Sequence, residues 1–260
     1  KKVNHFYAYN GFIYVSSGLG IVKINPTKNE VVESYYPTGS GDHILEMVIY
    51  QDSIFALTPN YLLKGYLHNP ALADQGEWDT VSRIGLPETA AQYKNLVLFQ
   101  NELYLSKIND VYGKDTIFQL TNSGLQFVVG DGNMEINNLK IDNQKLYVVQ
   151  LYGVLAYEAM NLAPYVIYQY AFSEQKNLKS VAVNNGDIYI GDAIHGLVYY
   201  RSLSDNRLLP LSGPPKNKYF SMGGTKDKLT ISGGSLYVNG FMFSTAGGYV
   251  LEDEKWTLMD

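Results

Sequence analysis

The chain has no cysteine in its 260 residues, which excludes disulfide bonds, thiolate metal ligands and cysteine nucleophiles. Histidine is scarce as well, and the four residues have neither the HxH nor the HExxH spacing of a histidine-built metal site: His5, His43, His68 and His195. No segment has the G-x-S-x-G pattern that a nucleophile elbow requires. We therefore predict no enzyme activity, no cofactor and no metal ion from these motifs.

Positive charge is also in short supply. The chain has 20 Lys and Arg against 25 Asp and Glu, a net charge of −5, and its basic residues are scattered. A nucleic-acid partner requires a basic face to neutralise phosphates, so this class of partner is excluded. No apolar run approaches the 18 residues of a membrane-spanning helix. Because the chain opens Lys-Lys-Val, without a Met or a signal peptide, we expect a processed or trimmed product.

What the sequence does contain is an internal repeat. An apolar residue followed by Tyr or Phe recurs six times at intervals of 41 to 49 residues: Ile13-Tyr14, Ile54-Phe55, Leu103-Tyr104, Leu146-Tyr147, Ile188-Tyr189 and Leu236-Tyr237. This interval is the length of one four-stranded propeller blade.

The surroundings of each pair repeat too. A tight polar turn precedes it, such as Asn10-Gly11, Asn143-Gln144 or Gly233-Gly234-Ser235, and an apolar strand precedes the turn. A third strand, often opening with Gly as at 20–24 and 153–157, and a more polar fourth strand complete each unit. Each repeat therefore predicts four strands, A to D, joined by short loops.

We predict an all-β fold: one β-propeller domain over residues 1–260 with six visible four-stranded blades. The approximate blades are 1–39, 40–86, 87–131, 132–173, 174–214 and 215–260, and a longer parent chain could supply a seventh. Stacking the sheets around an axis buries their apolar faces and leaves only short edges exposed. A two-sheet sandwich is the competing fold, but six in-phase units of similar length fit it poorly.

If strands A to D run outward from the axis, the B–C and D–A loops share one rim. A loop-rim recognition face is our site hypothesis, because function often resides in loops on a rigid scaffold. Its residues are Asp42, His43, Asp110, Tyr112, Asp131, Glu135, Asp192 and His195. The alternative is that these are ordinary solvated turn residues.

The segment Asp131-Gly132-Asn133-Met134-Glu135 is the best candidate for an ion site. Oxygen side chains at its first, third and fifth positions mimic the start of a calcium loop, and Asp142 occupies the twelfth position. The sixth position requires Gly for a sharp turn, but Ile136 stands there. We therefore favour a plain turn between blades over a calcium site.

Nearly the whole chain, in register, resembles the N-terminal propeller of PorZ-like proteins. The resemblance is carried by the run Gly11 to Ile24 with Glu33 to Tyr36, by Asp52 to Thr58 leading into Asn69 to Leu72 and Trp78, by Asp192 to Val198, and by Gly247 to Val250 with Lys255 to Thr257. The order and spacing of these motifs carry most of the resemblance, because each is ordinary for a propeller.

The resemblance implies a part in the type IX secretion system. PorZ-like proteins lie at the outer-membrane surface with an attachment complex, so the implied location is the cell surface, the outer membrane or the periplasm. The implied partners are other secretion-complex proteins and lipopolysaccharide or another glycan. The family has no known catalytic motif, so no catalytic residue is carried over. The expected function is a non-catalytic protein-interaction scaffold. Two alternatives stay open: a propeller enzyme acting on a polysaccharide, as a lyase or glycosidase, and the ligand-sensing propeller of a membrane-bound regulator.

Overall fold

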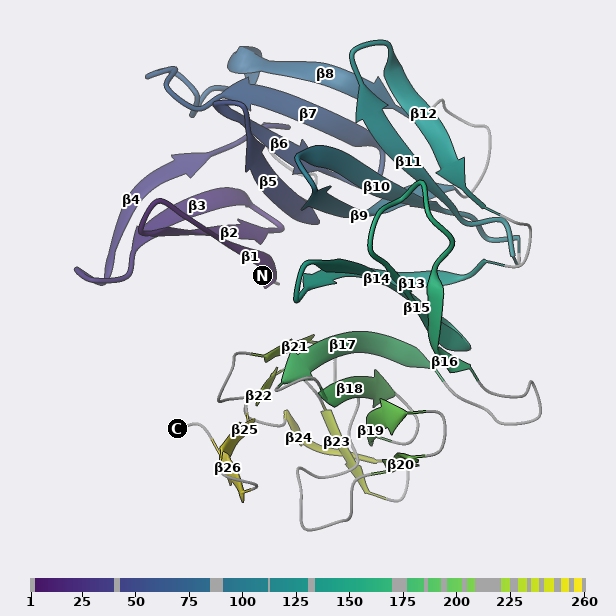
Figure 1. Cartoon of the computed structure of the whole chain (residues 1–260). Coiled ribbons are helices and arrows are strands. Elements are labelled where there is room, and N and C mark those ends of the chain that lie inside the picture. The colour runs from purple at the N-terminus through teal and green to yellow at the C-terminus, as the bar shows by residue number, and fades with distance from the viewer. Residues whose placement is uncertain are drawn as a thin grey trace. The chain divides into compact units, whose positions relative to one another are not determined.

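The computed structural model consists of antiparallel β-sheets (Figure 1). It describes residues 3–39, 43–84, 91–111, 113–130, 134–169, 177–184, 187–192, 196–202, 205–208, 221–224, 229–232, 235–238, 241–245, 249–252 and 255–258. Within these ranges its side chains are described as far as Asp192, apart from residue 184. The chain divides into two compact units, Lys1–Met134 and Glu135–Asp260.

Unit 1 contains three four-stranded sheets, each in simple meander order. The first has β1 (Val3–Tyr9), β2 (Phe12–Ser17), β3 (Gly20–Asn25) and β4 (Glu30–Tyr35). The second has β5 (Glu46–Tyr50), β6 (Ser53–Leu57), β7 (Tyr61–Tyr66) and β8 (Trp78–Arg83), with the 3-10 helix η1 (Gln75–Glu77) before β8. The third has β9 (Gln92–Phe99), β10 (Glu102–Ile108), β11 (Thr116–Thr121) and β12 (Gly124–Val129).

Unit 2 begins with two sheets of the same kind. One has β13 (Ile136–Asp142), β14 (Lys145–Gln150), β15 (Gly153–Tyr157) and β16 (Tyr165–Gln169), and the other has β17 (Leu178–Asn184), β18 (Asp187–Asp192), β19 (Gly196–Ser202) and β20 (Asp205–Leu208). A further four-stranded sheet has β21 (Ser221–Gly224), β22 (Leu229–Ser232), β25 (Tyr249–Glu252) and β26 (Lys255–Leu258). The hairpin of β23 (Ser235–Val238) and β24 (Phe241–Thr245) forms a separate two-stranded sheet.

This separate hairpin corrects one part of the repeat prediction. We expected the turn at Gly233-Gly234-Ser235 to pair the strand at 229–232 with the strand containing Leu236-Tyr237, but β22 pairs with β21 and β25 instead. Val238 and Phe241 are register partners in β23 and β24, so two residues, Asn239 and Gly240, separate these strands. Asn-Gly is among the strongest hairpin signals and accounts for the β23–β24 pairing.

The predicted A–B turns are confirmed in the first four sheets. Each is a two-residue connection, with register partners such as Tyr9 and Phe12 or Asp142 and Lys145 on either side. Both central residues of each turn have positive φ angles: Asn10 and Gly11, Gln51 and Asp52, Gln100 and Asn101, Asn143 and Gln144. Positive φ at both positions gives a twist that matches that of the flanking strands. These turns therefore set the register of the A–B pairs in the first four sheets.

Within each unit the first strands of successive sheets lie side by side. β1 contacts β5 and β5 contacts β9 in unit 1, while β13 contacts β17 and β17 contacts β21 in unit 2. Each of these strands is also the terminal strand of its sheet. This arrangement is the one that propeller blades adopt, with strand A innermost. We refer to these first strands as the inner strands.

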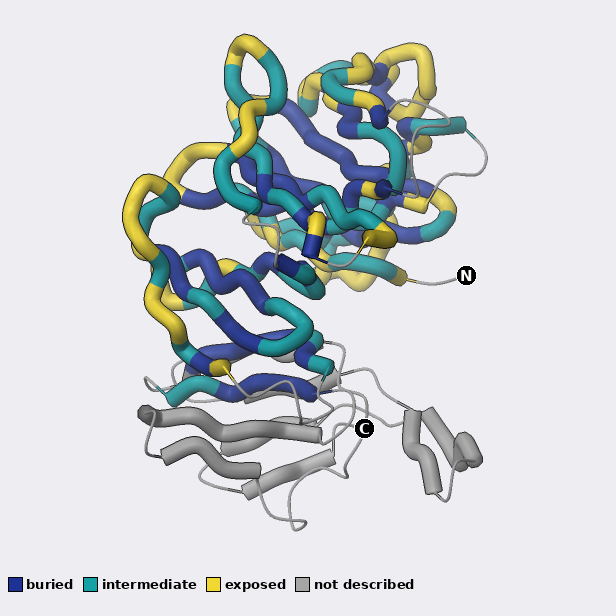
Figure 2. The backbone as a smooth tube through the Cα atoms, turned by 90° about the vertical axis from the view of Figure 1, so that its right-hand side faces the viewer, coloured by how far each residue is buried: buried dark blue, intermediate teal, exposed yellow. Residues whose placement is uncertain are grey.

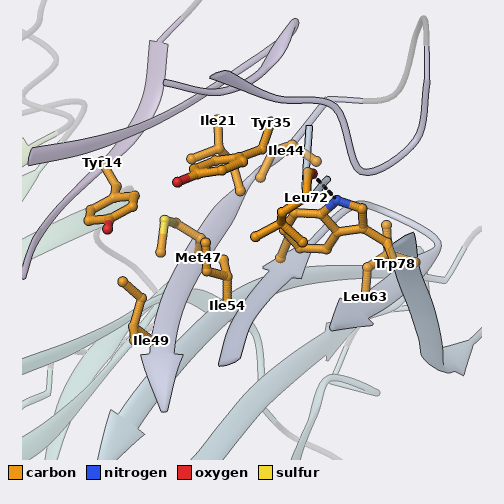
Figure 3. Close-up of a cluster of buried hydrophobic side chains, with 11 residues drawn as sticks. Tyr14, Ile21, Tyr35, Ile44, Met47, Ile49, Ile54, Leu63, Leu72 and Trp78 are labelled. Atoms are coloured by element: carbon orange, nitrogen blue, oxygen red, sulfur yellow. Dashed lines mark hydrogen bonds between the residues drawn. The ribbon is translucent and has the colours of Figure 1, made fainter. Parts of the chain in front are cut away.

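Apolar side chains fill the space between neighbouring sheets, and Figure 2 shows buried residues running along the strands while exposed residues gather at turns. The first cluster in unit 1 joins the first two sheets through Tyr14, Met47 and Trp78 (Figure 3). The Trp78 Nε1–H donates a hydrogen bond to the Leu72 carbonyl at 3.0 Å. A second cluster joins the second and third sheets, and a cluster in unit 2 joins the sheets of β13–β16 and β17–β20.

Gly20 opens β3 with a φ of +129°, and a Cβ there would lie 2.3 Å from the Tyr35 carbonyl oxygen. We expect Gly20→Ala to lower the free energy of unfolding, measured by urea denaturation, by more than the roughly 1–2 kcal/mol that a left-handed alanine costs. Gly11→Ala is the matched control, because Gly11 has a φ of +77° and open space around it. If both variants lost the same free energy of unfolding, the close approach of the Tyr35 carbonyl to Gly20 would not be what requires glycine there.

Burial, assisted by the Glu33 carboxylate, raises the pKa of Tyr14 from its ordinary value of 10.0 to about 12. A phenol whose pKa is raised on folding stabilises the fold fully below its unfolded pKa, and this contribution is lost as pH rises through the folded pKa. We therefore expect stability to fall between about pH 10 and pH 12. Urea denaturation at a series of pH values should show Tyr14→Phe removing part of this pH dependence of stability, and an unchanged profile would count against it.

Candidate functional site

The loops predicted to share one rim do lie together in unit 1. The His43 ring lies against Gly18 in the β2–β3 turn, so that a Cβ built on Gly18 would be 2.7 Å from His43 Nδ1. The next residue, Ile44, donates its N–H to the Ser17 carbonyl at 3.1 Å. The D–A loop before β5 therefore packs on the B–C loop of the first sheet, which places both on one rim.

The third sheet repeats this arrangement. In its B–C loop the Asn109 N–H donates to Asp115 Oδ1 at 2.8 Å, which orders the loop that contains Asp110. The Asp115 N–H then donates to the Met134 carbonyl at 3.2 Å, and Lys114 forms a parallel bridge with Met134. The segment after the third sheet, at Met134, is thus hydrogen-bonded to the loop that contains Asp110.

In unit 2, the Leu151 N–H of the β14–β15 loop donates to the Glu135 carbonyl at 2.9 Å. Asp192, at the end of β18, is fully buried, and its Oδ1 accepts the Asn177 N–H at 3.1 Å. The Asp192 carboxylate therefore orders the start of β17 from inside the protein. Glu135 is half-buried.

The eight rim residues consequently differ in their surroundings. His43 and Asp110, both in unit 1, are exposed. Among the described residues, the two side chains form no hydrogen bond or ion pair with each other. Four of the eight predicted residues lie outside the described part of the chain: Asp42, Tyr112, Asp131 and His195. The first three positions of the calcium-like segment lie there too, and Asp142, its twelfth residue, accepts the Val183 N–H at 2.9 Å. Among the described residues, no three His, Asp or Glu side chains are grouped as metal ligands would be.

The sequence reasoning missed a β-bulge near the start of the inner strands. In β1, β13 and β17 the register with the following strand skips one residue, which is Asn4, Asn137 or Lys179. In β9 two residues, Lys94 and Asn95, lie opposite the single residue Ser106 of β10. Each single skipped residue stands ten positions before the Tyr of the repeated pair, at Tyr14, Tyr147 or Tyr189. This fixed spacing was the signal available in the sequence.

A bulge redirects a side chain out of the regular pleat, and here it directs amides toward a neighbouring inner strand or the loop that leads into it. Asn4 Nδ2 donates to the Ile44 carbonyl at 2.7 Å, and Asn137 Nδ2 donates to the Leu178 carbonyl at 2.7 Å. Asn95 Nδ2 donates to Glu46 Oε1 at 3.2 Å, which links β9 back to β5. The bulged amides thus hydrogen-bond one sheet to the next within each unit.

At the fourth such position the bulged residue is a cation. Lys179 Nζ donates to Asn137 Oδ1 at 3.1 Å, while Asn138 Nδ2 donates to the Lys179 carbonyl at 3.2 Å. Burial lowers the pKa of Lys179, and attraction to the Asp192 carboxylate opposes this effect. A polar cluster of one lysine, three asparagines and one buried carboxylate therefore lies where the inner strands of unit 2 begin, and its carboxylate, Asp192, comes from the end of β18.

Unit 1 also contains a pocket of about 230 Å³ between the outer strand β4 and the loop that follows β7. Its lining residues are Glu33, Ser34, Tyr35, Leu67, Asn69, Pro70, Leu72 and Ala73. The Tyr35 hydroxyl donates a hydrogen bond to the Glu33 carboxylate, and Lys23 Nζ lies 3.0 Å from it. These contacts, the Tyr35 bond foremost, lower the pKa of Glu33 and hold it as an ionised carboxylate.

The meander sheets, with inner strands side by side in each unit, define an all-β protein of the β-propeller class. Within that class, residues 1–79 match the family described as the PorZ N-terminal β-propeller domain of the type IX secretion system. The sequence resemblance to PorZ-like proteins is thereby confirmed. No curated protein matches the chain. In the described residues no helix is long and apolar enough to cross a membrane.

Solved structures share the fold. PorZ of Porphyromonas gingivalis, a bacterial surface component of the type IX secretion system, is 15% identical with a TM-score of 0.58 over 100% of this chain and 33% of its own. The extracellular domain of a hybrid two-component system of B. thetaiotaomicron is 11% identical, with a TM-score of 0.67 over 94% of this chain and 37% of its own. A luciferin-regenerating enzyme is 10% identical, with a TM-score of 0.62 over 95% and 89%.

The chain spans about a third of the length of the PorZ and two-component-system structures. At these identities the similarity shows the fold alone. The same scaffold occurs in a secretion component, in the extracellular domain of a two-component system and in an enzyme, so the fold by itself does not select a function.

We expect Asn137→Ala to lower the free energy of unfolding by about 1–3 kcal/mol, because it removes the donor to the Leu178 carbonyl and leaves that group without this bond. Urea denaturation measures the change. Asn161→Ala is the control, since Asn161 is exposed in the loop before β16. If both variants were as stable as the parent protein, the bulged amides would not hold the sheets together.

Proposed function

We propose that this chain is a non-catalytic protein-interaction module of a type IX secretion surface complex, with its six four-stranded sheets serving as propeller blades. The observation that carries the proposal is the match of residues 1–79 to the PorZ N-terminal propeller family. Similarity in fold to PorZ across the chain is consistent with it. The partners we propose are other proteins of that complex.

The contact face in this proposal is the rim that bears His43 and Asp110. Both side chains are exposed, yet their loops are anchored by backbone hydrogen bonds to Ser17 and Met134. An anchored loop with exposed polar side chains loses little conformational freedom when a partner binds. This combination favours the rim over the exposed turns of the opposite side.

The propeller-enzyme alternative requires carboxylates that converge on a pocket, one of them with a raised pKa. The pocket beside β4 has a single carboxylate, Glu33, and its pKa is lowered. A carboxylate held ionised by Tyr35 and Lys23 is unsuited to act as a general acid. This observation supports the non-catalytic proposal.

The test is affinity purification from the native envelope, with quantification of the co-purified secretion components. We expect the double variant His43→Ala/Asp110→Ala to reduce their recovery at least tenfold. The matched control is His68→Ala/Asp52→Ala, which removes an exposed histidine–aspartate pair, 3.7 Å apart, from the opposite rim of unit 1. Full recovery with the rim variant, or equal loss with both variants, would refute the proposed contact face.

A further inference from the structure

Lys179 lies in the bulge of an inner strand, as Lys94 does in β9. It is the extra residue of the bulge between Leu178 and Ser180, at the start of inner strand β17. Asparagine occupies the corresponding positions in β1 and β13, where its amide links neighbouring inner strands. A lysine at this position adds a positive charge where the repeat requires only a hydrogen-bond donor.

Among the residues whose side chains the structure describes, no ion pair balances this charge. Other shielded lysines of the described chain pair directly with carboxylates, as Lys23 does with Glu33 and Lys145 with Glu158, each at 3.0 Å. None of the ion pairs among the described side chains includes Lys179. Its Nζ instead donates to the neutral Asn137 amide oxygen.

Half-burying an ammonium group without a counterion costs free energy. Asp192 attracts Lys179 from beyond ion-pair distance, and this attraction does not cancel the effect of burial on the Lys179 pKa. An ammonium has three N–H donors, and among the described residues the bond to Asn137 uses one of them. Lys179 is half-buried, so the residue is not closed off from solvent.

We propose that Lys179 anchors a binding site for an oxyanion, a carboxylate or phosphate group, at the start of the inner strands of unit 2. The anion supplies the missing negative charge and accepts the free N–H groups of the ammonium, and Asn137 holds the lysine side chain in place. Charge-assisted hydrogen bonds of this kind are about twice as strong as neutral ones. The site is independent of the secretion partner proposed above.

Binding is tested on the full chain by NMR of lysine labelled with 13C at the ε position. Sodium phosphate or sodium acetate is titrated against sodium chloride at constant ionic strength. We expect one lysine signal, absent in Lys179→Met, to shift with saturation. The stronger of the two titrations identifies phosphate or carboxylate as the preferred group. The absence of a saturable shift, or its persistence in Lys179→Met, would overturn the proposal.

A stability measurement separates this role from a merely structural one. If Lys179 serves a ligand, Lys179→Met will be at least as stable as the parent protein in anion-free urea denaturation, and the preferred anion will raise the urea midpoint of the parent protein only. If Lys179 serves only to hold Asn137, the variant will unfold at lower urea and neither protein will respond to the anion.

Lys145→Met is the matched control, because it removes a lysine that has its own carboxylate partner, Glu158. This variant should keep the full anion response of the parent protein. Lys179→Gln, which retains a hydrogen-bond donor, replaces Lys179→Met if the latter does not fold. Anion binding within tenfold of the parent protein in Lys179→Gln would also refute the proposal.

Discussion

The free edge of each inner strand is the constraint on which the structure depends. These strands pair with a neighbour in their own sheet on one side only, so the other edge presents backbone groups that need partners. The protein supplies partners from the adjacent inner strand: Asn4 reaches the Ile44 carbonyl, and Asn137 reaches the Leu178 carbonyl. Carboxylates serve the N–H groups, as Glu46 does for Leu96 at 2.5 Å. Apolar packing stabilises the contact between sheets, and these hydrogen bonds fix how the sheets are aligned.

The same constraint concentrates polar chemistry near one rim. The bulges lie at the start of the inner strands, next to the loops where His43 packs on Gly18 and Asp115 bonds to Met134. The bulged side chains that hydrogen-bond the sheets together are therefore close in sequence to the exposed side chains of the loops. Asp192 and Asp110 illustrate the difference: both lie in or beside B–C loops, but Asp192 is buried and structural, whereas Asp110 is exposed. Lys179 combines the two roles because it fills a structural position with a charged group.

Much of the fold could be predicted because its signals are local. A two-residue turn with positive φ at both positions, as at Asn10-Gly11, forces the flanking strands to pair, and alternating apolar residues then choose the buried face. The prediction failed near the C-terminal end, where β23 pairs with β24 and not with β22. Of the predicted rim residues that the structure describes, His43 and Asp110 are exposed and Asp192 is buried. This difference was not predictable, because exposure depends on which loops pack together.

The sequence by itself determined the all-β class, the strand repeat, the turns and the resemblance to PorZ-like propellers, since periodicity and turn residues act over a few positions. Only the tertiary structure decided that Asn4 and Asn137 are directed toward the next sheet and Lys179 toward the preceding one, and that Asp192 faces inward. These outcomes depend on backbone groups some forty residues away, such as the Ile44 and Leu178 carbonyls. A hydrogen bond of that range forms only after the sheets have packed, so no local pattern specifies its partner.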